Sequence, residues 1–153
     1  MDVLLLFLHL LALVCWLGSI IFFSFFTAPV LFRTLERQEA GDLIGKIFPN
    51  YYRLGYICGA LALLTLVSQP SEVMSIKLGL LLAMIVCTLF AGLAINPNAR
   101  AVKERLRVAV LEDEKTSLEA RFKKLHRLSV QLNATTLFAG LGFLWYTAMG
   151  LTL

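Results

Sequence analysis

Four long stretches of the sequence lack every charged side chain. No Asp, Glu, Lys or Arg occurs in Val3–Phe32, Leu54–Ser71, Leu78–Ala99 or Leu128–Leu153. An α-helix rises about 1.5 Å per residue, so each stretch is long enough to cross the roughly 30 Å hydrocarbon core of a bilayer. The apolar fraction of 59% and the mean hydropathy of +0.80 agree with this interpretation. We therefore expect four membrane-spanning helices.

Common catalytic motifs are also missing. The sequence contains no Walker loop, no dinucleotide-binding glycine fingerprint, no G-x-S-x-G, no H-E-x-x-H and no C-x-x-C. Every Asp and Glu lies near a terminus or between the uncharged stretches, so a relay of intramembrane carboxylates for proton pumping is not expected. These absences favour a protein that is not an enzyme.

Cysteine is scarce, and Cys15, Cys58 and Cys87 all lie inside the uncharged stretches, which does not indicate a disulfide framework. Cys15 and Cys87 have similar predicted depths in the membrane, and Met84 is about one helical turn from Cys87. Thiolate and thioether sulfurs suit Cu(I), so these three residues are candidate metal ligands. Cysteine also packs well as a small apolar residue, and both interpretations stay open.

The net charge of +4 is distributed unevenly. All 14 Lys and Arg residues except Lys77 lie in segments 33–53 and 100–127. The positive-inside rule then places both basic segments in the cytoplasm and both termini outside, as in a bacterial inner membrane. No interleaved aromatic and basic motif is present, so nucleic acid is not an expected partner. The expected partner is the lipid bilayer, with other membrane subunits or a second copy of the chain as alternatives.

These patterns predict an all-α fold, a four-transmembrane-helix bundle that forms one integral membrane domain over residues 1–153. The spans are expected at about 3–26, 51–69, 73–95 and 126–150, with a helical cytoplasmic connection at 97–125. In Leu35–Phe48, apolar residues recur at helical spacing opposite charged ones, which predicts a short interfacial amphipathic helix.

Pro29 is expected to end or kink the first helix, Pro49 to end the amphipathic helix, and Thr116 to cap the last helix together with Glu119. Pro70 and Ser71 are expected to turn the chain between the second and third spans. Gly55 and Gly59, four residues apart in the second span, form a face that predicts close helix contact.

The segment Arg121–Gly140 begins basic and becomes apolar. Wound as an α-helix, it places on one narrow stripe the residues His126, Ser129, Asn133, Thr136 and Gly140. A polar stripe that enters a bilayer is costly unless it faces protein or water, so it predicts a binding site. The structural alternatives are an interfacial histidine at 126 and interhelical hydrogen bonds from Ser129 and Asn133.

We expect this stripe to face a small polar cavity that opens toward the cytoplasm. Asn96 and Arg100 follow the third span and Tyr51 and Tyr52 begin the second, so these side chains are expected to close the cavity. Asn96 is alternatively the N-cap of the helix that follows it. Burial of Asn133 without a hydrogen-bond partner would cost about 1–3 kcal/mol, so partners or water are expected there.

His9 and Trp16 are secondary candidates on one face of the first helix, seven residues apart. A helix-contact histidine and a core tryptophan are the structural alternatives. His9 and His126 are predicted near opposite faces of the membrane, so one haem would not take both as axial ligands. No cofactor is expected, with b-haem or Cu(I) as the alternatives.

Four stretches together resemble a known family: LHLLALVCWLGSIIFFSFFTAPVLFRTL at 8–35, AGDLIGKIFPNYY at 40–52, NPNAR at 96–100 and FKKLHRLSVQLNATTLFAG at 122–140. This pattern is similar to a little-characterised four-helix integral membrane family that includes the eukaryotic transmembrane protein associated with cisplatin resistance. The likeness covers nearly the whole chain. It implies a link to metal or drug tolerance without a mechanism. The function that we expect is non-enzymatic, either binding or passage of a small solute or metal ion or an accessory role in the membrane.

A more distant likeness is to copper-resistance D-type membrane domains and the J-type protoporphyrinogen oxidase, which also begin with a histidine-bearing helix and a Trp-x-Gly turn. This likeness implies the alternative function, a haem- or metal-dependent membrane oxidoreductase. The oxidase's second histidine after the first helix is absent, because Phe32, Arg33 and Thr34 stand there.

Overall fold

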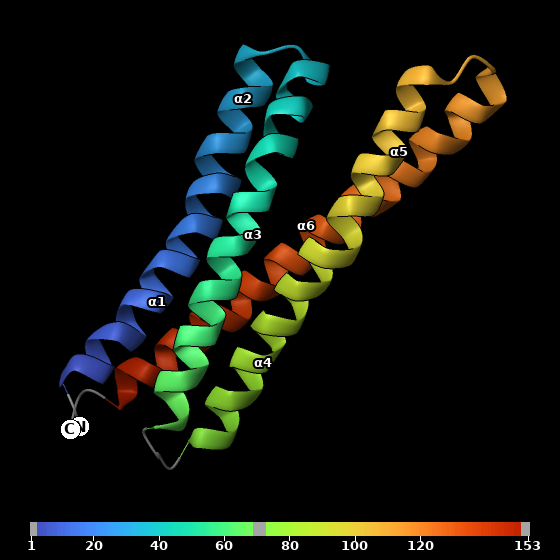
Figure 1. Ribbon diagram of the computed structural model, residues 1–153. Helices are drawn as coiled ribbons and strands as arrows, with labels where there is room; N and C mark the ends of the chain where they lie inside the picture. The colour runs from blue at the N-terminus through green and yellow to red at the C-terminus, as the bar shows by residue number, and fades with distance from the viewer. Residues whose placement is uncertain (1–2, 69–72, 151–153) are drawn as a thin grey trace.

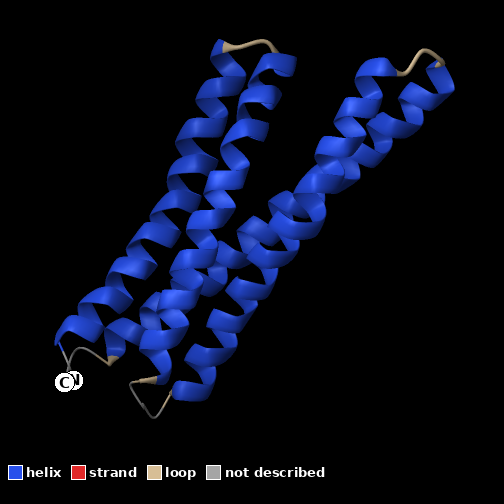
Figure 2. Ribbon diagram, in the orientation of Figure 1, coloured by secondary structure: helices blue, strands red, loops and turns tan. Residues whose placement is uncertain are grey.

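The computed structural model describes residues 3–68 and 73–150, and this part of the chain contains helices and short loops but no strand (Figure 2). The predicted all-α class is confirmed. The helices, in chain order, are α1 (Val3–Ile21), the π-helix η1 (Phe22–Thr27), α2 (Ala28–Thr34), α3 (Arg37–Val67), α4 (Met74–Phe90), the π-helix η2 (Ala91–Ile95), α5 (Asn96–Val108) and α6 (Glu112–Met149). The turn predicted at Pro70–Ser71 lies outside the described residues.

The described helices join into four continuous helices that form two antiparallel hairpins (Figure 1). The first hairpin pairs α1–η1–α2 with α3, and the second pairs α4–η2–α5 with α6. Both chain termini lie at one end of the molecule, here called the terminal end. The connections at Leu35–Glu36 and Ala109–Leu111 lie at the opposite end, the loop end. Two of the four, Val3–Thr34 and Met74–Val108, are long and apolar enough to cross a membrane.

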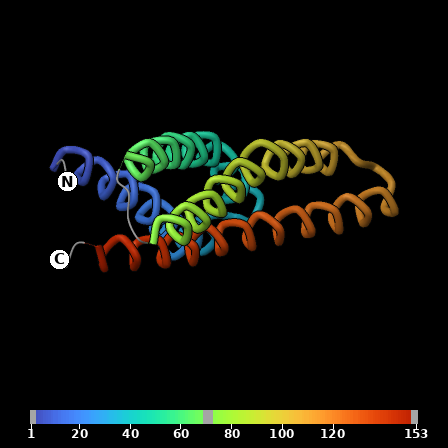
Figure 3. Tube along the Cα trace, turned by 90° about the horizontal axis from the view of Figure 1, so that it is seen from below, coloured from blue at the N-terminus to red at the C-terminus, as the bar shows by residue number. Residues whose placement is uncertain are grey.

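The helices pack as a ring near the terminal end and separate toward the loop end. Around the ring, α1 contacts α3, α3 contacts α4, α4 contacts α6 and α6 contacts α1. Figures 1 and 3 show the two hairpins diverging, with the α5–α6 connection farthest from the termini. The pairs α1–α4 and α3–α6 are therefore on the diagonals of the ring.

Pro29 and Pro97 do not end helices, so of the two outcomes predicted for Pro29, a helix end or a kink, the helix end is wrong. A proline inside a helix clashes with the carbonyl four residues earlier. Each of these prolines is the second residue after a π-helix, η1 before Pro29 and η2 before Pro97. A π-turn widens the backbone and shifts its hydrogen bonds, so the helix passes the proline and continues.

Pro49 also lies within a helix, because α3 runs unbroken from Arg37 to Val67. The separate interfacial amphipathic helix at Leu35–Phe48 is therefore wrong, since this segment is the first part of α3. An interior proline costs about 3 kcal/mol. Packing on both sides offsets that cost: Phe48 contacts the rings of Phe23 and Tyr52, and Ala40 is fully buried before the proline.

The predicted caps at Thr116 and Asn96 are also wrong. Helix α6 begins at Glu112, and the Thr116 hydroxyl donates to the Glu112 carbonyl inside the first turn. Asn96 has helical backbone angles, and no side-chain cap is present at the start of α5. Both residues fit a local capping rule, but the helix before each of them continues, so neither needs to serve as a cap.

Trp16 packs at the centre of the helix ring. Its indole lies against Gly55 and Gly59 of α3, where a Cβ at Gly59 would lie 3.1 Å from Trp16 Cη2 and 3.2 Å from Ile85 Cγ1 of α4. The glycines let three helices approach closely, as small-x-x-x-small faces do within membranes. Trp16 is 2% exposed and belongs to the main apolar core. The predicted close contact at Gly55 and Gly59 is confirmed.

We predict that Gly59→Leu lowers stability by about 1–3 kcal/mol, because the new side chain must displace Trp16 or Ile85. Thermal unfolding of the detergent-solubilised protein measures the effect. Gly79→Leu is the matched control, since no atom lies within 4 Å of a Cβ at Gly79. Equal transition temperatures for the two variants would contradict this account of the core.

Candidate functional site

Two tyrosines of α3 reach across the diagonal of the ring to α6 at the level where the hairpins begin to separate. The Tyr51 hydroxyl donates to Asn133 Oδ1 at 3.1 Å, and the hydroxyls of Tyr52 and Ser129 are 3.5 Å apart. Tyr52 is 2% exposed, whereas Asn133 and Ser129 are half-buried. The structure thus brings together four residues that the sequence singled out, through side chains long enough to span the diagonal.

The remaining residues of the predicted stripe differ in how deeply they are buried. Thr136 is buried and its hydroxyl donates to the Leu132 carbonyl of its own helix. Gly140 is buried where a Cβ would lie 2.4 Å from Leu17 Cδ2, so this position serves close packing. His126 is exposed and stacks on Phe122, with ring centroids 6.4 Å apart. His126 is therefore separate from the tyrosine contacts.

A cavity of about 270 Å³ lies beside Tyr52, between α3 and the η2–α5 segment. It is lined by Pro49, Tyr52, Arg53, Tyr56, Gly92, Leu93, Asn96, Pro97 and Arg100. The predicted residues Asn96 and Arg100 are both present, but Ser129, Asn133 and Thr136 are not part of the lining. Tyr52 is the link, because it lines this cavity and its hydroxyl is 3.5 Å from that of Ser129.

Arg53, Tyr56 and Gly92 also line the cavity, and the sequence analysis missed them. On a helix that continues through Pro49, the residues Pro49, Tyr52, Arg53 and Tyr56 share one face at i, i+3, i+4 and i+7. Tyr52, Arg53 and Tyr56 all lie in the span predicted at 51–69, so helical spacing from Tyr52 could have identified the other two. Gly92, Asn96 and Arg100 are four residues apart along a helix that passes Pro97 without a break, and the boundary predicted between the span at 73–95 and the connection at 97–125 concealed that spacing.

Gly92 sets the shape of the cavity wall. A Cβ there would lie 2.0 Å from the Tyr56 hydroxyl and 2.8 Å from Tyr52 Cγ, so both rings lie directly over this residue. Within the described residues, no hydrogen bond is recorded for the side chains of Tyr56, Asn96 or Arg100. The cavity therefore presents polar groups that are available to a ligand.

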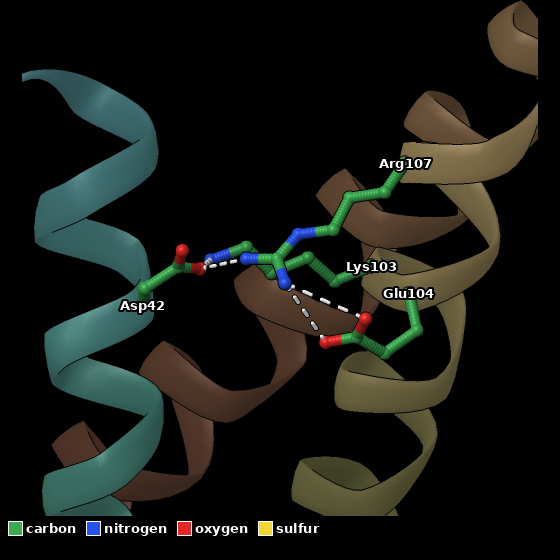
Figure 4. A network of polar contacts seen from close by, with 4 residues as sticks. All are labelled: Asp42, Lys103, Glu104 and Arg107. Carbon is green, nitrogen blue, oxygen red and sulfur yellow. Dashed lines mark hydrogen bonds and ion pairs between the residues drawn. The ribbon is translucent and has the colours of Figure 1, made fainter.

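An ionic network joins the two hairpins beyond the cavity, near the loop end (Figure 4). Asp42 Oδ1 of α3 accepts hydrogen bonds from both Lys103, at 2.5 Å, and Arg107 of α5. Arg107 also donates to Glu104 on its own helix. The partners are partly exposed, and such pairs stabilise proteins little, so the network acts mainly to fix α5 relative to α3.

The hydrogen bond from Lys103 holds the pKa of the Asp42 carboxyl below its ordinary value, and the charges of Lys103 and Arg107 act in the same direction. A carboxyl whose pKa is lowered by folding contributes its stabilisation above its ordinary pKa, which is about 4. That contribution is lost as the pH falls through the lowered value. The link between the hairpins is therefore fully ionised at neutral pH.

A second polar group lies at the terminal end, with one buried side chain from each of four helices: His9, Thr65, Lys77 and Thr147. His9 Nδ1 is 2.7 Å from Thr65 Oγ1. Because the Thr65 hydroxyl donates to the Leu61 carbonyl, the histidine is the donor in this contact. Lys77 Nζ lies beside Gly150 at the C-terminal end of α6, where the helix dipole favours a cation.

Sequence reasoning singled out His9 but missed its partners at the terminal end. Lys77 could have been identified, because it is the one basic residue outside the two basic segments. Nothing in the sequence distinguishes Thr65 or Thr147, because a threonine in an apolar helix commonly bonds to its own backbone.

The candidate sulfur ligands differ in their exposure. Cys15 is exposed on α1 and Cys87 is half-buried on α4. Met84 is fully buried, with its methyl group 3.0 Å from a Cβ position at Gly140. A Cu(I) site formed by these three residues stays a prediction.

The residues present do not fit a b-haem. The His9 ring is enclosed in the core, bonded to Thr65 and edge-on to Phe143 with centroids 5.4 Å apart. The other histidine, His126, is exposed toward the loop end of α6. Within the described residues, no group of three or more His, Cys, Asp and Glu side chains is placed to hold a metal ion.

The structure defines an all-helical protein of two antiparallel hairpins with two helices of membrane-spanning length. Residues 11–107 match the family described as "Domain of unknown function (DUF4149)", and the chain belongs to that family. It is 33% identical over 135 residues to a protein of Aquifex aeolicus (strain VF5) named "Uncharacterized protein", covering 88% of this chain and 89% of that one. No solved structure matches the chain.

For the terminal end, we predict that Thr65→Val destabilises the protein by about 1–3 kcal/mol, because it removes the acceptor of the buried His9 N–H. Thr147→Val is the matched control, since the Thr147 hydroxyl is buried but bonds only to the Phe143 carbonyl of its own helix. Thermal unfolding in detergent compares the two. A loss as large for Thr147→Val would show that the His9 contact contributes nothing specific.

Proposed function

We propose that the protein is an integral membrane protein that crosses the bilayer four times and binds a small solute in the loop-end cavity. One observation supports the proposal that the protein crosses the bilayer. Large apolar side chains are exposed on every continuous helix, including Phe7 (58%), Leu64 (66%), Val86 (62%) and Phe138 (71%). Apolar patches of this extent are rare on proteins that face water on all sides, whereas a bilayer covers them.

The composition of α3 and α6 is consistent with membrane spans despite their lower hydropathy. Their polar and small residues, such as Tyr52, Gly59, Thr136 and Gly140, are buried against other helices. A polar residue that faces protein does not meet lipid, so it adds little to the cost of insertion. In residues 54–67 of α3 and 128–149 of α6, most of the exposed side chains are apolar.

The distribution of charge supports an orientation with the loop end in the cytoplasm. Both basic segments belong to the loop-end halves of the hairpins, and Lys77 alone is at the terminal end. The positive-inside rule then places the termini outside. Trp145, which is 67% exposed near the end of α6, suits the outer interface, where aromatic residues are enriched.

The cavity supports a binding role rather than catalysis. Its polar groups are arginine, asparagine and tyrosine, which bind and orient ligands, and its lining contains no carboxylate, histidine or cysteine. The resemblance to the family of the cisplatin-resistance-associated protein supports a role in metal or drug tolerance. In this proposal the solute enters from the cytoplasm beside Arg100 and reaches Tyr52, whose contact with Ser129 connects the cavity to α6.

The proposed topology predicts opposite outcomes for reporters at the two ends of the molecule. Alkaline phosphatase fused to the C-terminus should be active, because it folds only outside the cytoplasm. The same reporter inserted at Val110, which is 83% exposed in the α5–α6 connection, should be inactive. Fluorescent-protein fusions should give the reverse pattern. A fluorescent C-terminal fusion, or extraction of the protein by carbonate, would contradict the proposal.

For the binding role, we predict that Asn133→Leu abolishes tolerance to cisplatin or copper salts in a complemented deletion strain while the protein still accumulates in the membrane. Leucine leaves the Tyr51 hydroxyl without its acceptor. Gln131→Leu is the control, because Gln131 is an exposed amide two residues away.

A double variant distinguishes a binding role of the Tyr51–Asn133 pair from a purely structural role. Replacing both partners of a hydrogen bond by apolar groups is often nearly neutral for stability. If the pair is only structural, Tyr51→Phe combined with Asn133→Leu should restore stability and tolerance together. The proposal requires that stability returns and tolerance does not.

A further inference from the structure

The loop-end cavity combines two cationic groups with an apolar wall. Arg53 of α3 and Arg100 of α5 both line it, and neither forms an ion pair within the described residues. Arg53 makes only a 3.5 Å contact with Asn50 Oδ1. Both arginines are exposed, and guanidinium groups that line one cavity without an ion-pair partner suit a phosphate, which accepts their paired N–H donors. The Tyr56 hydroxyl, directly over Gly92, adds a further donor.

The apolar surface continues from the cavity toward the middle of the molecule. On α3, Ile57 is one turn from Arg53 and is 65% exposed. On the neighbouring continuous helix, Leu93 lines the cavity and is 66% exposed, and Val86, two turns further, is 62% exposed. A hydrocarbon chain that leaves the cavity along these faces would stay in contact with apolar side chains.

We propose that the cavity binds a phosphate-bearing lipid, with the phosphate between Arg53 and Arg100 and an acyl chain along Leu93 and Ile57. This inference rests on the proposed function, because it assigns the ligand class of the same cavity. The exposed apolar faces favour a lipid over a soluble phosphate, because an acyl chain would contact these faces and a soluble phosphate would not. Basic pockets between membrane helices on the cytoplasmic side bind anionic head groups in the same way.

Native mass spectrometry of the full chain in detergent tests the assignment with three probes. Phosphatidylglycerol carries the phosphate and the chains, dioleoylglycerol lacks the phosphate, and inorganic phosphate lacks the chains. We expect one phosphatidylglycerol per protein, bound at least about tenfold more tightly than either other probe. Equal binding of dioleoylglycerol would overturn the role of the phosphate. Saturation by inorganic phosphate at the affinity of the lipid would overturn the lipid source.

Matched arginine variants separate a specific site from general attraction to a basic surface. Arg53→Gln combined with Arg100→Gln should weaken phosphatidylglycerol binding about tenfold or more. Arg105→Gln combined with Arg121→Gln removes the same charge from exposed positions outside the cavity and should leave binding unchanged. Equal losses in the two double variants would overturn the site.

A second pair of variants keeps every charge and covers the case in which the arginine variants do not fold. Gly92→Ala should weaken binding because its methyl group displaces Tyr56, whereas Gly79→Ala should not. Retention of full affinity in Gly92→Ala would overturn the site. If the topology reporters fail, the membrane proposal itself fails. If they succeed and phosphatidylglycerol does not bind, only the lipid assignment fails.

Discussion

The contact of Trp16 with Gly55 and Gly59 is the interaction on which the arrangement of the helices depends. At this level α1, α3 and α4 approach as closely as backbone allows, because two glycines leave room for one indole and the side chains of Ile85 and Thr88. Toward the loop end the hairpins diverge. There the diagonal is spanned by tyrosine side chains, and the cavity beside Tyr52 lies at the same level.

Continuity of the backbone through three prolines is the second constraint. In a hydrocarbon environment each unpaired backbone group costs several kcal/mol, so a helix that breaks within the bilayer is penalised strongly. The π-helices before Pro29 and Pro97 keep the chain helical at the loop end of both hairpins. One of them, η2, supplies Gly92 and Leu93 to the cavity, so the local widening that accommodates Pro97 also shapes the candidate site.

The sequence was sufficient to predict the helices and much of the loop-end polar set, since charge-free runs and helical spacing are local properties. It placed Gly55 and Gly59 at a close contact, and Tyr51 and Tyr52 near the stripe of α6. Its predictions of helix ends failed at Pro29, Pro49 and Thr116. The usual rules for helix ends describe isolated segments, whereas in this fold tertiary packing keeps the helices continuous at these residues. Arg53 and Tyr56 follow Tyr52 by one and four residues in the span predicted at 51–69, so helical spacing could have added them to the site. Gly92 could not be placed opposite them before the helices were packed.

The two polar groups of the molecule differ in how far their hydrogen bonds are satisfied, and this difference supports the proposed position of the binding site. At the terminal end, the His9 N–H donates to Thr65, whose own proton is donated to a backbone carbonyl, and Lys77 lies against the end of α6. At the loop end, Arg100 and Tyr56 have no such partners within the described residues. Arg100 is exposed and Tyr56 is half-buried, so water can solvate both side chains, and a ligand that enters the cavity can replace that water. The closed group at the terminal end therefore stabilises the helix ring, and the open group at the loop end is where binding is expected.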